Sequence, residues 1–365
     1  MSLDAPFARV RFAFRADASV DIGNGHLMRC LTLADALRAR GAECHFICRE
    51  LSGHLLDLIA RRGFLGYRLA TGTDGSAVVG WTQDARQSAA ILSEVRPEWL
   101  IADHYGLDHK WETELRPYYR KLLVIDDLVR THSCDVLLDQ TFRRSPETYR
   151  ACVPAGCTVL TGSEYALLRP EFAALRRRSL ERRVGAPWRT VLVSVGGVDQ
   201  SNVTSSVLEG LRAAPLPAEC VLKVVLGQHA PGLGEVQHRA REMPWLTQVL
   251  VDVTDMASLM AEADFAIGAA GTTSWERCCL GLPSFVVVIA DNQRDVAAAL
   301  QSSGAAYVIT EMTQLAPVLQ QAIAEQTCSV ESVLRMSRAA SEVTDGKGVT
   351  RVLEHLNAGS TGSTR

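Results

Sequence analysis

The sequence predicts an α/β protein with two Rossmann-like βαβ domains and a cleft between them. Two observations support this fold class. Short apolar runs alternate with amphipathic helical patterns along the 365 residues, which is typical of parallel sheets covered by helices. The alternation stops once, at an arginine-rich stretch over 174–187, and then starts again. We expect domains at 1–175 and 176–365, the arginines on a solvated helix face, and a disordered tail at 359–365.

The composition limits the partners of the chain. Hydrophobic residues make up 47% of it, and the formal net charge of -3 comes without a basic stripe, so no nucleic-acid partner is expected. There is no apolar run of membrane-spanning length and no signal peptide, so we expect a cytoplasmic protein without a membrane partner. The ten cysteines lack zinc spacing and are interpreted as reduced thiols. The oligomeric state stays open.

The first strand, the turn after it and the start of the first helix lie within residues 10–29. The alternation of Phe12 and Phe14 with less apolar residues predicts a strand. A polar loop follows over 17–24, and helical spacing of apolar residues begins at Leu27.

Two glycines, Gly23 and Gly25, stand in this turn directly before His26. Glycine tolerates the backbone angles of a tight turn and lets a substrate approach closely. The positive end of the helix dipole disfavours a protonated imidazole, and a neutral histidine can accept a proton. His26 is therefore a candidate general base. The alternative is a surface histidine that caps the helix.

The first half continues with strands expected at 44–48, 64–69, 99–102, 122–125 and 136–138, and with helices expected at 53–62, 81–95 and 108–119. Several of its strands end in an acidic residue: Asp17, Asp103, Asp126 and Asp139. Ligands bind beyond the carboxyl ends of parallel strands, so these side chains should gather near a ligand. Their spacing does not fit a metal site, and no metal is expected.

One strand end reads Asp103-His104-Tyr105 and is a candidate ligand contact. The alternatives are a buried His104 satisfied by the backbone and a Tyr105 that covers the sheet edge. The adjacent pair Asp126-Asp127 is not expected to form an acid pair, because neighbouring residues on a strand point to opposite faces.

The second half repeats the pattern. Strands are expected at 190–195, 221–226, 249–251, 264–267 and 284–289, and helices at 201–213, 256–263 and 274–280 and over most of the remainder. The first of these strands is followed by Gly196 and Gly197, which form a loop that a ligand can approach closely.

The strongest motif of this half covers 268–276, where a strand ends, a glycine-rich turn follows and a helix begins. Backbone N–H groups, the helix dipole and the hydroxyls of Thr272, Thr273 and Ser274 would together bind an anion such as a diphosphate. Glu276, about one turn into the helix, could accept two hydrogen bonds from a ribose. The alternative is an ordinary N-cap with a favourable acid in the first turn.

Six motifs stand in the order found in one enzyme family: Gly-Asn-Gly-His-Leu-Met-Arg at 23–29, Asp-His-Tyr-Gly-Leu-Asp at 103–108, Tyr-Ala-Leu-Leu-Arg-Pro at 165–170, Val-Gly-Gly-Val-Asp at 195–199, Gly-Thr-Thr-Ser-Trp-Glu at 271–276 and Ala-Asp-Asn-Gln at 290–293. With them the sequence resembles the pseudaminic acid pathway sugar hydrolase family, from about Arg11 to Leu356. Members of this family release UDP from UDP-2,4-diacetamido-2,4,6-trideoxy-β-L-altropyranose. They have the GT-B fold and are similar to the bacterial lipid II-forming N-acetylglucosaminyltransferase. Asn24 departs from the family pattern, which often has an aromatic or other residue there.

The resemblance implies roles for the matching residues. His26 matches the family's proposed general base, and the N-terminal domain would face the sugar. The expected substrate-binding residues are Gly23, Gly25, Asp103, His104, Tyr105, Gly196, Gly197, Gly271, Thr272, Thr273, Glu276, Asn292 and Gln293. Among these, the motif at 271–276 matches the part that holds UDP, and Asn292 and Gln293 match a turn that faces the sugar and the phosphates. No cofactor is expected.

The chain is therefore interpreted as a UDP-sugar hydrolase of pseudaminic-type nonulosonic acid biosynthesis, serving flagellin or surface glycan modification. Water would attack the anomeric carbon while His26 takes its proton, and UDP would leave with inversion and without a metal. Three alternatives stay open: a GT-B glycosyltransferase with another acceptor, a UDP-sugar 2-epimerase, and a non-catalytic UDP-sugar-binding partner.

Overall fold

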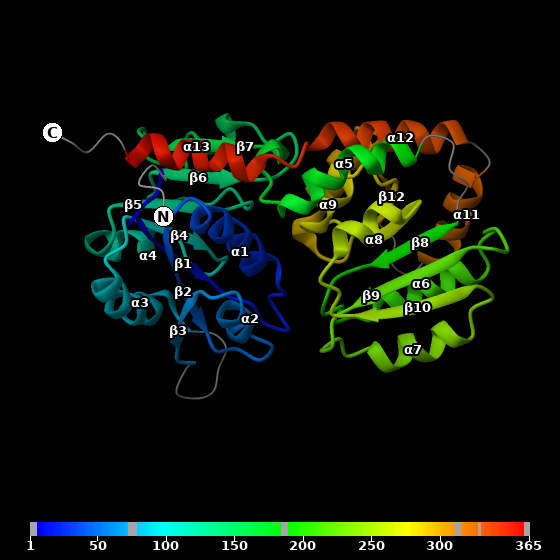
Figure 1. Cartoon of the computed structure of the whole chain (residues 1–365), viewed down its shortest axis with the longest axis horizontal. Helices are drawn as coiled ribbons and strands as arrows, with labels where there is room; N and C mark the ends of the chain where they lie inside the picture. Colours follow the sequence, from blue (N-terminus) through cyan, green and yellow to red (C-terminus); the bar gives the residue numbers. More distant parts are fainter. Residues whose placement is uncertain (1–5, 72–78, 184–188, 311–314, 328–329, 361–365) are drawn as a thin grey trace. The chain divides into compact units, whose positions relative to one another are not determined.

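The computed structural model describes residues 6–71, 79–183, 189–310, 315–327 and 330–360. The chain divides into two compact units, one formed by Met1–Leu167 with Lys347–Arg365 and the other by Leu168–Gly346. Each unit contains a sheet of parallel strands covered by helices, which confirms the predicted fold class of two α/β domains (Figure 1).

Seven parallel strands form the sheet of the first unit, in the order β3-β2-β1-β4-β5-β6-β7. The strands are β1 (Arg11–Ala16), β2 (Glu43–Arg49), β3 (Leu65–Leu69), β4 (Trp99–Asp103), β5 (Lys121–Ile125), β6 (Val136–Asp139) and β7 (Thr158–Thr161). The helices are α1 (Gly25–Arg38), α2 (Leu56–Arg61), α3 (Trp81–Val95), α4 (His109–Glu114) and α13 (Gly348–Ser360), with 3₁₀ turns η1 (Arg116–Tyr118), η2 (Pro146–Tyr149) and η3 (Ser163–Tyr165).

Both faces of this sheet are buried. Phe12 and Phe14 of β1 pack in one apolar cluster with residues of α1, α2 and α13, and Ala13 between them packs in a second cluster with residues of α3 and α4. Strands covered on both faces are apolar along most of their length, so polar side chains concentrate at their ends.

The second unit has six parallel strands in the order β10-β9-β8-β11-β12-β13. The strands are β8 (Thr190–Ser194), β9 (Val221–Leu226), β10 (Leu246–Val251), β11 (Phe265–Ala269), β12 (Ser284–Val287) and β13 (Tyr307–Ile309). The helices are α5 (Pro170–Arg182), α6 (Val203–Arg212), α7 (Leu233–Arg241), α8 (Met256–Glu262), α9 (Thr273–Cys279), α10 (Arg294–Ser302), α11 (Leu315–Thr327) and α12 (Val330–Val343), with a 3₁₀ turn η4 (Asp291–Gln293).

Several elements differ from the sequence prediction, among them α7, which was not predicted, and β10, which begins before the predicted strand 249–251. The helix expected over 108–119 is interrupted after Glu114, because Pro117 lacks the N–H group that a helix interior needs. The short strands β7 and β13 were not predicted. They have four and three residues and pair at the edges of the sheets, and such short segments have too few residues to show a strand pattern.

The second domain was predicted to span 176–365, and both of these bounds are wrong. Residues from 168 onward join the second unit because α5 packs there, and Ser179 Oγ donates a hydrogen bond of 2.8 Å to the carbonyl of Leu280. From Lys347 the chain returns to the first unit. A Cβ at Gly348 would lie 2.3 Å from the carbonyl oxygen of Ala166, so glycine permits the close contact with which α13 begins.

Apolar residues of α13, namely Val352, Leu353 and Leu356, complete the core of the first unit. An amphipathic pattern predicts a buried helix face but does not indicate which core covers it, which explains the error. The predicted tail begins later than expected, since α13 extends to Ser360 and 361–365 lie outside the described residues.

The arginine run is only partly a solvated helix face. Arg177 is exposed, as predicted, with 89% of its side chain accessible. Arg176 and Arg183 instead donate to backbone carbonyls of the second unit, and Arg183 is buried. Residues 184–187 of the predicted run lie outside the described residues.

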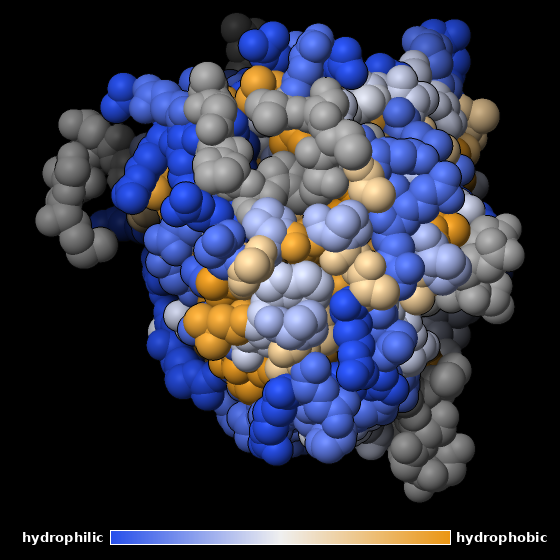
Figure 2. Space-filling model, turned by 90° about the vertical axis from the view of Figure 1, so that its right-hand side faces the viewer, coloured by the Kyte–Doolittle hydropathy of each residue, from blue (hydrophilic) through white to orange (hydrophobic). Residues whose placement is uncertain are grey.

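The surface shown in Figure 2 is mostly hydrophilic, with small apolar areas separated by polar residues where the residues are coloured. Over the described residues, none of the helices combines the length and the apolar character required to cross a bilayer.

Candidate active site

The structure brings His26 and Asp103 together at the carboxyl end of β1 and β4. Asp103 is the last residue of β4, pairs with Ala16 in the sheet and is fully buried. Its Oδ1 lies 2.5 Å from Nδ1 of His26, near the start of α1. An ionised carboxylate only accepts hydrogen bonds, so Nδ1 carries the proton, and Nε2 of a neutral imidazole is left as the acceptor.

Arg29 completes this cluster and was not assigned a role from the sequence. Its Nε donates to Asp103 Oδ2 and its Nη2 to Asp103 Oδ1, both at 2.6 Å. Burial alone would raise the pKa of Asp103, but the charge of Arg29 and then the contact with His26 hold that pKa well below its usual range. Asp103 therefore stays ionised. The available signal was helical spacing, because Arg29 follows His26 by three residues and shares its face.

Tyr105 lies next to the imidazole. The two rings meet edge to face with their centroids 4.5 Å apart, and the Tyr105 hydroxyl donates to Asp127 Oδ2 at 3.1 Å. Tyr105 is 37% exposed, which is enough for contact with a ligand. Its predicted role in substrate binding stays a prediction.

His104 was also predicted to bind substrate. Its Nδ1 accepts a 2.9 Å hydrogen bond from the backbone N–H of Gly106, and its Nε2 lies 3.2 Å from Asp17 Oδ2. Both ring nitrogens therefore have partners inside the first unit. The side chain is 21% exposed, so it is not the buried histidine of the structural alternative, and its predicted role in substrate binding stays a prediction.

The turn before α1 is ordered by its own backbone. The N–H of Gly23 donates to the carbonyl of Ser19 at 2.8 Å, and Ser19 Oγ accepts from the N–H groups of Asp21 and Ile22. Gly23 has a φ of +78°, which favours glycine, and nothing lies within 4 Å of where a Cβ would stand. Gly25 is the first residue of α1.

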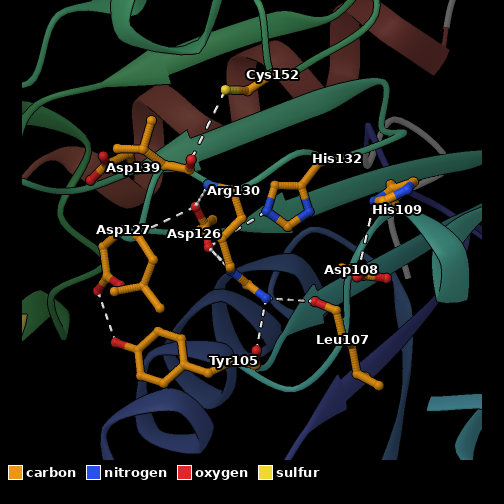
Figure 3. Close-up of polar contacts among 12 residues, drawn as sticks. Tyr105, Leu107, Asp108, His109, Asp126, Asp127, Arg130, His132, Asp139 and Cys152 are labelled. Carbon is orange, nitrogen blue, oxygen red and sulfur yellow. Dashed lines mark hydrogen bonds and ion pairs between the residues drawn. The ribbon is translucent and has the colours of Figure 1, made fainter.

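The other strand-end aspartates are each paired with an arginine. Asp17 binds Arg15, Asp126 binds Arg130, and Asp139 binds Arg144, with shortest N–O distances of 2.6, 2.7 and 2.8 Å. Figure 3 shows that Asp126 and Asp127 turn to different partners, as expected for adjacent residues. Over the described part of the chain, no three His, Cys, Asp or Glu residues are grouped so as to hold a metal ion.

In the second unit, the glycine-rich turn between β11 and α9 encloses an unpaired cation. Arg277 is buried, and its guanidinium donates to the carbonyl of Ala269 at 2.8 Å, to Ser274 Oγ at 3.0 Å and to Thr273 Oγ1 at 3.3 Å. Its Nε is buried without a hydrogen-bond partner, and no ion pair joins Arg277 to a carboxylate of the described residues. Burial therefore lowers the pKa of Arg277.

The predicted anion-binding residues of this turn have different surroundings. Thr272 is exposed and Thr273 is half-buried, and nothing lies within 4 Å of a Cβ placed on Gly271. Ser274 is buried, and its hydroxyl already donates to the carbonyl of Ala269 and accepts from Arg277, so it is not available to a ligand.

Glu276 has a partner that the sequence did not suggest. Its Oε1 lies 3.6 Å from Nη2 of Arg169, a residue of the 165–170 motif that directly precedes α5. Burial raises the pKa of the Glu276 carboxyl, against the opposing charges of Arg169 and Arg277. The side chain remains 17% exposed.

The remaining predicted residues of this unit lie in two loops. Gly196 has open space around the position of a Cβ, and the carbonyl of Gly197 accepts from the N–H of Gly227 at 2.8 Å. Asn292 is exposed, whereas Gln293 Oε1 accepts from the N–H of Ile289 at 3.2 Å within its own turn.

Comparison with known proteins confirms the resemblance and the fold. Residues 190–351 match the model of the glycosyltransferase family 28 C-terminal domain. The chain is 26% identical over 301 residues to the UDP-2,4-diacetamido-2,4,6-trideoxy-β-L-altropyranose hydrolase of Campylobacter jejuni, which covers 81% of this chain and 97% of that protein. It is 27% identical over 205 residues to the spore coat polysaccharide biosynthesis protein SpsG of Bacillus subtilis, covering 56% of this chain and 59% of that protein.

Among solved structures, MurG of Acinetobacter baumannii superposes with a TM-score of 0.71 at 16% identity, over 96% of this chain and 99% of that one. The two parallel-sheet units therefore have the GT-B type of fold that the resemblance implied.

Proposed function

We propose that this chain is a nucleotide-sugar hydrolase that releases UDP from a UDP-linked 2,4-diacetamido-2,4,6-trideoxy sugar, for pseudaminic-type nonulosonic acid biosynthesis. The observation that carries the proposal is the His26–Asp103 pair, because Asp103 occupies Nδ1 and leaves Nε2 of the neutral ring to accept a proton. The Campylobacter jejuni relative, which is named for such a hydrolysis, supports the choice of reaction.

In this proposal, Nε2 of His26 takes a proton from water as the water oxygen attacks the anomeric carbon. Asp103 then stabilises the imidazolium, and Arg29 keeps that carboxylate ionised. The bond from the anomeric carbon to the phosphate oxygen breaks, and UDP leaves with the bonding electrons. One direct displacement inverts the anomeric configuration.

The second unit supplies the groups that bind UDP. A buried cation that forms no ion pair is costly, and Arg277 is such a cation among the described residues, with a buried Nε that has no hydrogen-bond partner. A diphosphate on the Gly271 turn provides the missing negative charge. Glu276, steadied by Arg169, accepts hydrogen bonds from the ribose hydroxyls.

This arrangement also stabilises the leaving group. Negative charge grows on the diphosphate as the bond breaks, and a fixed cation with the first N–H groups of a helix favours that charge without reorganisation. We therefore expect turnover to continue in a chelator.

A glycosyltransferase is the second candidate. The match of residues 190–351 to a glycosyltransferase domain model favours it, since a transferase would bind the nucleotide in the same way and replace water by another acceptor.

A panel of UDP-sugars, with and without candidate acceptors, separates these functions. We expect UDP release without an acceptor, at equal rates with and without a chelator. UDP release that needs an acceptor would identify a transferase, and sugar interconversion without UDP release would identify an epimerase. Binding without turnover would leave only a binding partner. Loss of turnover in chelator, restored by Mg²⁺ or Mn²⁺, would contradict the metal-free reaction.

A further inference from the structure

Arg130 holds the loop that follows β4. This residue lies between β5 and β6, and its Nη1 donates to the carbonyls of Tyr105 and Leu107, both at 2.8 Å. Its Nη2 lies 3.4 Å from the carbonyl of His104. One guanidinium therefore fixes three backbone carbonyls of the segment 104–107, two of which are drawn in Figure 3.

The guanidinium is itself fixed by Asp126. Nε of Arg130 donates to Asp126 Oδ1 at 2.7 Å, and the backbone N–H of Arg130 donates to Oδ2 at 3.1 Å. Asp126 is fully buried, and Nε2 of His132 lies 3.5 Å from its Oδ1. The Nε and backbone N–H of Arg130 are therefore bound by the buried Asp126, and its Nη1 binds the loop after β4.

The loop that Arg130 grips carries Tyr105. The Tyr105 ring packs edge to face against His26, and its hydroxyl is tied to Asp127, the residue after Asp126. The His26 ring is thus bounded by Asp103 through a hydrogen bond and by Tyr105 through ring packing. A shift of the 104–107 backbone would remove the second of these contacts.

We propose that Arg130 is a positioning residue for His26, acting through Tyr105 and without touching the substrate. The inference rests on the proposed function of His26 as the base. A misplacement of about 1 Å can cost about 100-fold in rate, so the contact need not be large to matter.

The central experiment is a double-mutant cycle on UDP release. We expect Arg130→Gln to lower kcat by about 10- to 100-fold with little change in KM, because a group that acts only on the chemical step affects kcat alone. Tyr105→Ala should have a loss of similar size. If Arg130 acts through Tyr105, the double variant should be no slower than the slower single variant.

Two further variants separate positioning from charge and folding. Arg130→Lys keeps a cation for Asp126 but lacks the planar fork that reaches two carbonyls, so it should fold normally and still lose kcat. Arg120→Gln removes an arginine of the same unit that is paired with Glu98 and 69% exposed, and it should keep the wild-type kcat.

A second readout does not depend on turnover. The Tyr105 ring shifts the NMR resonances of the His26 ring protons, and Arg130→Gln should move them toward the values in Tyr105→Ala. Wild-type resonances in Arg130→Gln or Arg130→Lys would overturn the inference, as would losses that multiply in the double variant. A wild-type protein that releases no UDP would instead contradict the proposed function, and the resonances would still decide the role of Arg130.

Discussion

The carboxyl ends of the two sheets differ in their charge balance. In the first unit, four strand-end aspartates are buried, and each is paired with an arginine: Asp17 with Arg15, Asp103 with Arg29, Asp126 with Arg130 and Asp139 with Arg144. In the second unit, helix α9, which follows the turn after β11, contains a buried arginine, Arg277, that forms no ion pair with the described residues.

The difference indicates what each edge can do. Balanced pairs hold side chains in fixed directions, and at β4 the direction fixed is that of the His26 imidazole. A buried cation without an ion pair, beside an open glycine turn, is the arrangement for which we propose anion binding. Asp199, a buried acid of the second unit, differs from the strand-end aspartates of the first unit. It accepts from the backbone N–H groups of Val203 and Thr204, and it forms no ion pair with an arginine of the described residues.

The largest effect is expected at the edge of the first sheet, where each strand-end aspartate is paired with an arginine. His26→Asn keeps a side chain of similar size but removes the base, and kcat should fall about 10²- to 10⁴-fold. UDP affinity by calorimetry should be unchanged. Near-normal turnover in a folded variant would exclude His26 as the base.

The second largest effect is expected in the second unit, on removal of the buried Arg277 side chain. Arg277→Gln should weaken UDP binding by about 2–5 kcal/mol, the range for removing one partner of a buried charge pair, and should leave uridine binding unchanged. Arg183→Gln is the matched control. Arg183 is another buried arginine of this unit, but each of its guanidinium nitrogens donates to a carbonyl or a hydroxyl. Equal losses for UDP and uridine in Arg277→Gln would remove the diphosphate from the argument.

A third prediction concerns the pH dependence of the free energy of unfolding, through His132 beside the strand-end Asp126 of the first unit. Burial alone would lower the pKa of His132, but Asp126 and Glu112 raise it to about 9 from an ordinary value of 6.5. A raised pKa contributes stability that is complete below about pH 6.5 and is lost as pH rises through about 9. Each factor of ten in proton affinity is worth ~1.4 kcal/mol, so the free energy of unfolding should fall by about 3 kcal/mol over this window.

Denaturant titrations from pH 6 to 10 measure this loss. His132→Gln should flatten the curve, whereas His238→Gln, at a side chain that is 70% exposed, should leave its shape unchanged. A wild-type curve that is flat through pH 9 would show that His132 is not charged in the folded protein.

The smallest effect concerns the ribose. Glu276→Ala should weaken UDP binding by about 1.5–3 kcal/mol if the carboxylate accepts charge-assisted hydrogen bonds. Glu171→Ala removes the other acid beside Arg169, since Glu171 Oε1 lies 3.4 Å from Nη1 of Arg169. This variant should leave UDP affinity unchanged. Unchanged affinity in a folded Glu276→Ala variant would make Glu276 only an acid of the first helical turn.

Features that depend on neighbouring residues could be predicted from the sequence. Alternating apolar patterns predicted two parallel-sheet domains, and the first strand, turn and helix placed His26 at a helix start. The same local reading identified the aspartates at strand ends and the glycine turn before Glu276. These features follow from backbone preference and side-chain period, which act over a few residues.

Which of these groups contact one another could not be predicted, because the contacts depend on the packing of distant segments. His26 and Asp103 are 77 positions apart, and their contact exists because β1 and β4 are neighbours in the sheet although they are not consecutive in the chain. The return of α13 to the first core and the burial of Arg277 without an ion pair to the described residues have the same origin. Pairing and burial depend on how distant segments pack, and a local pattern contains no record of the surface that will cover it.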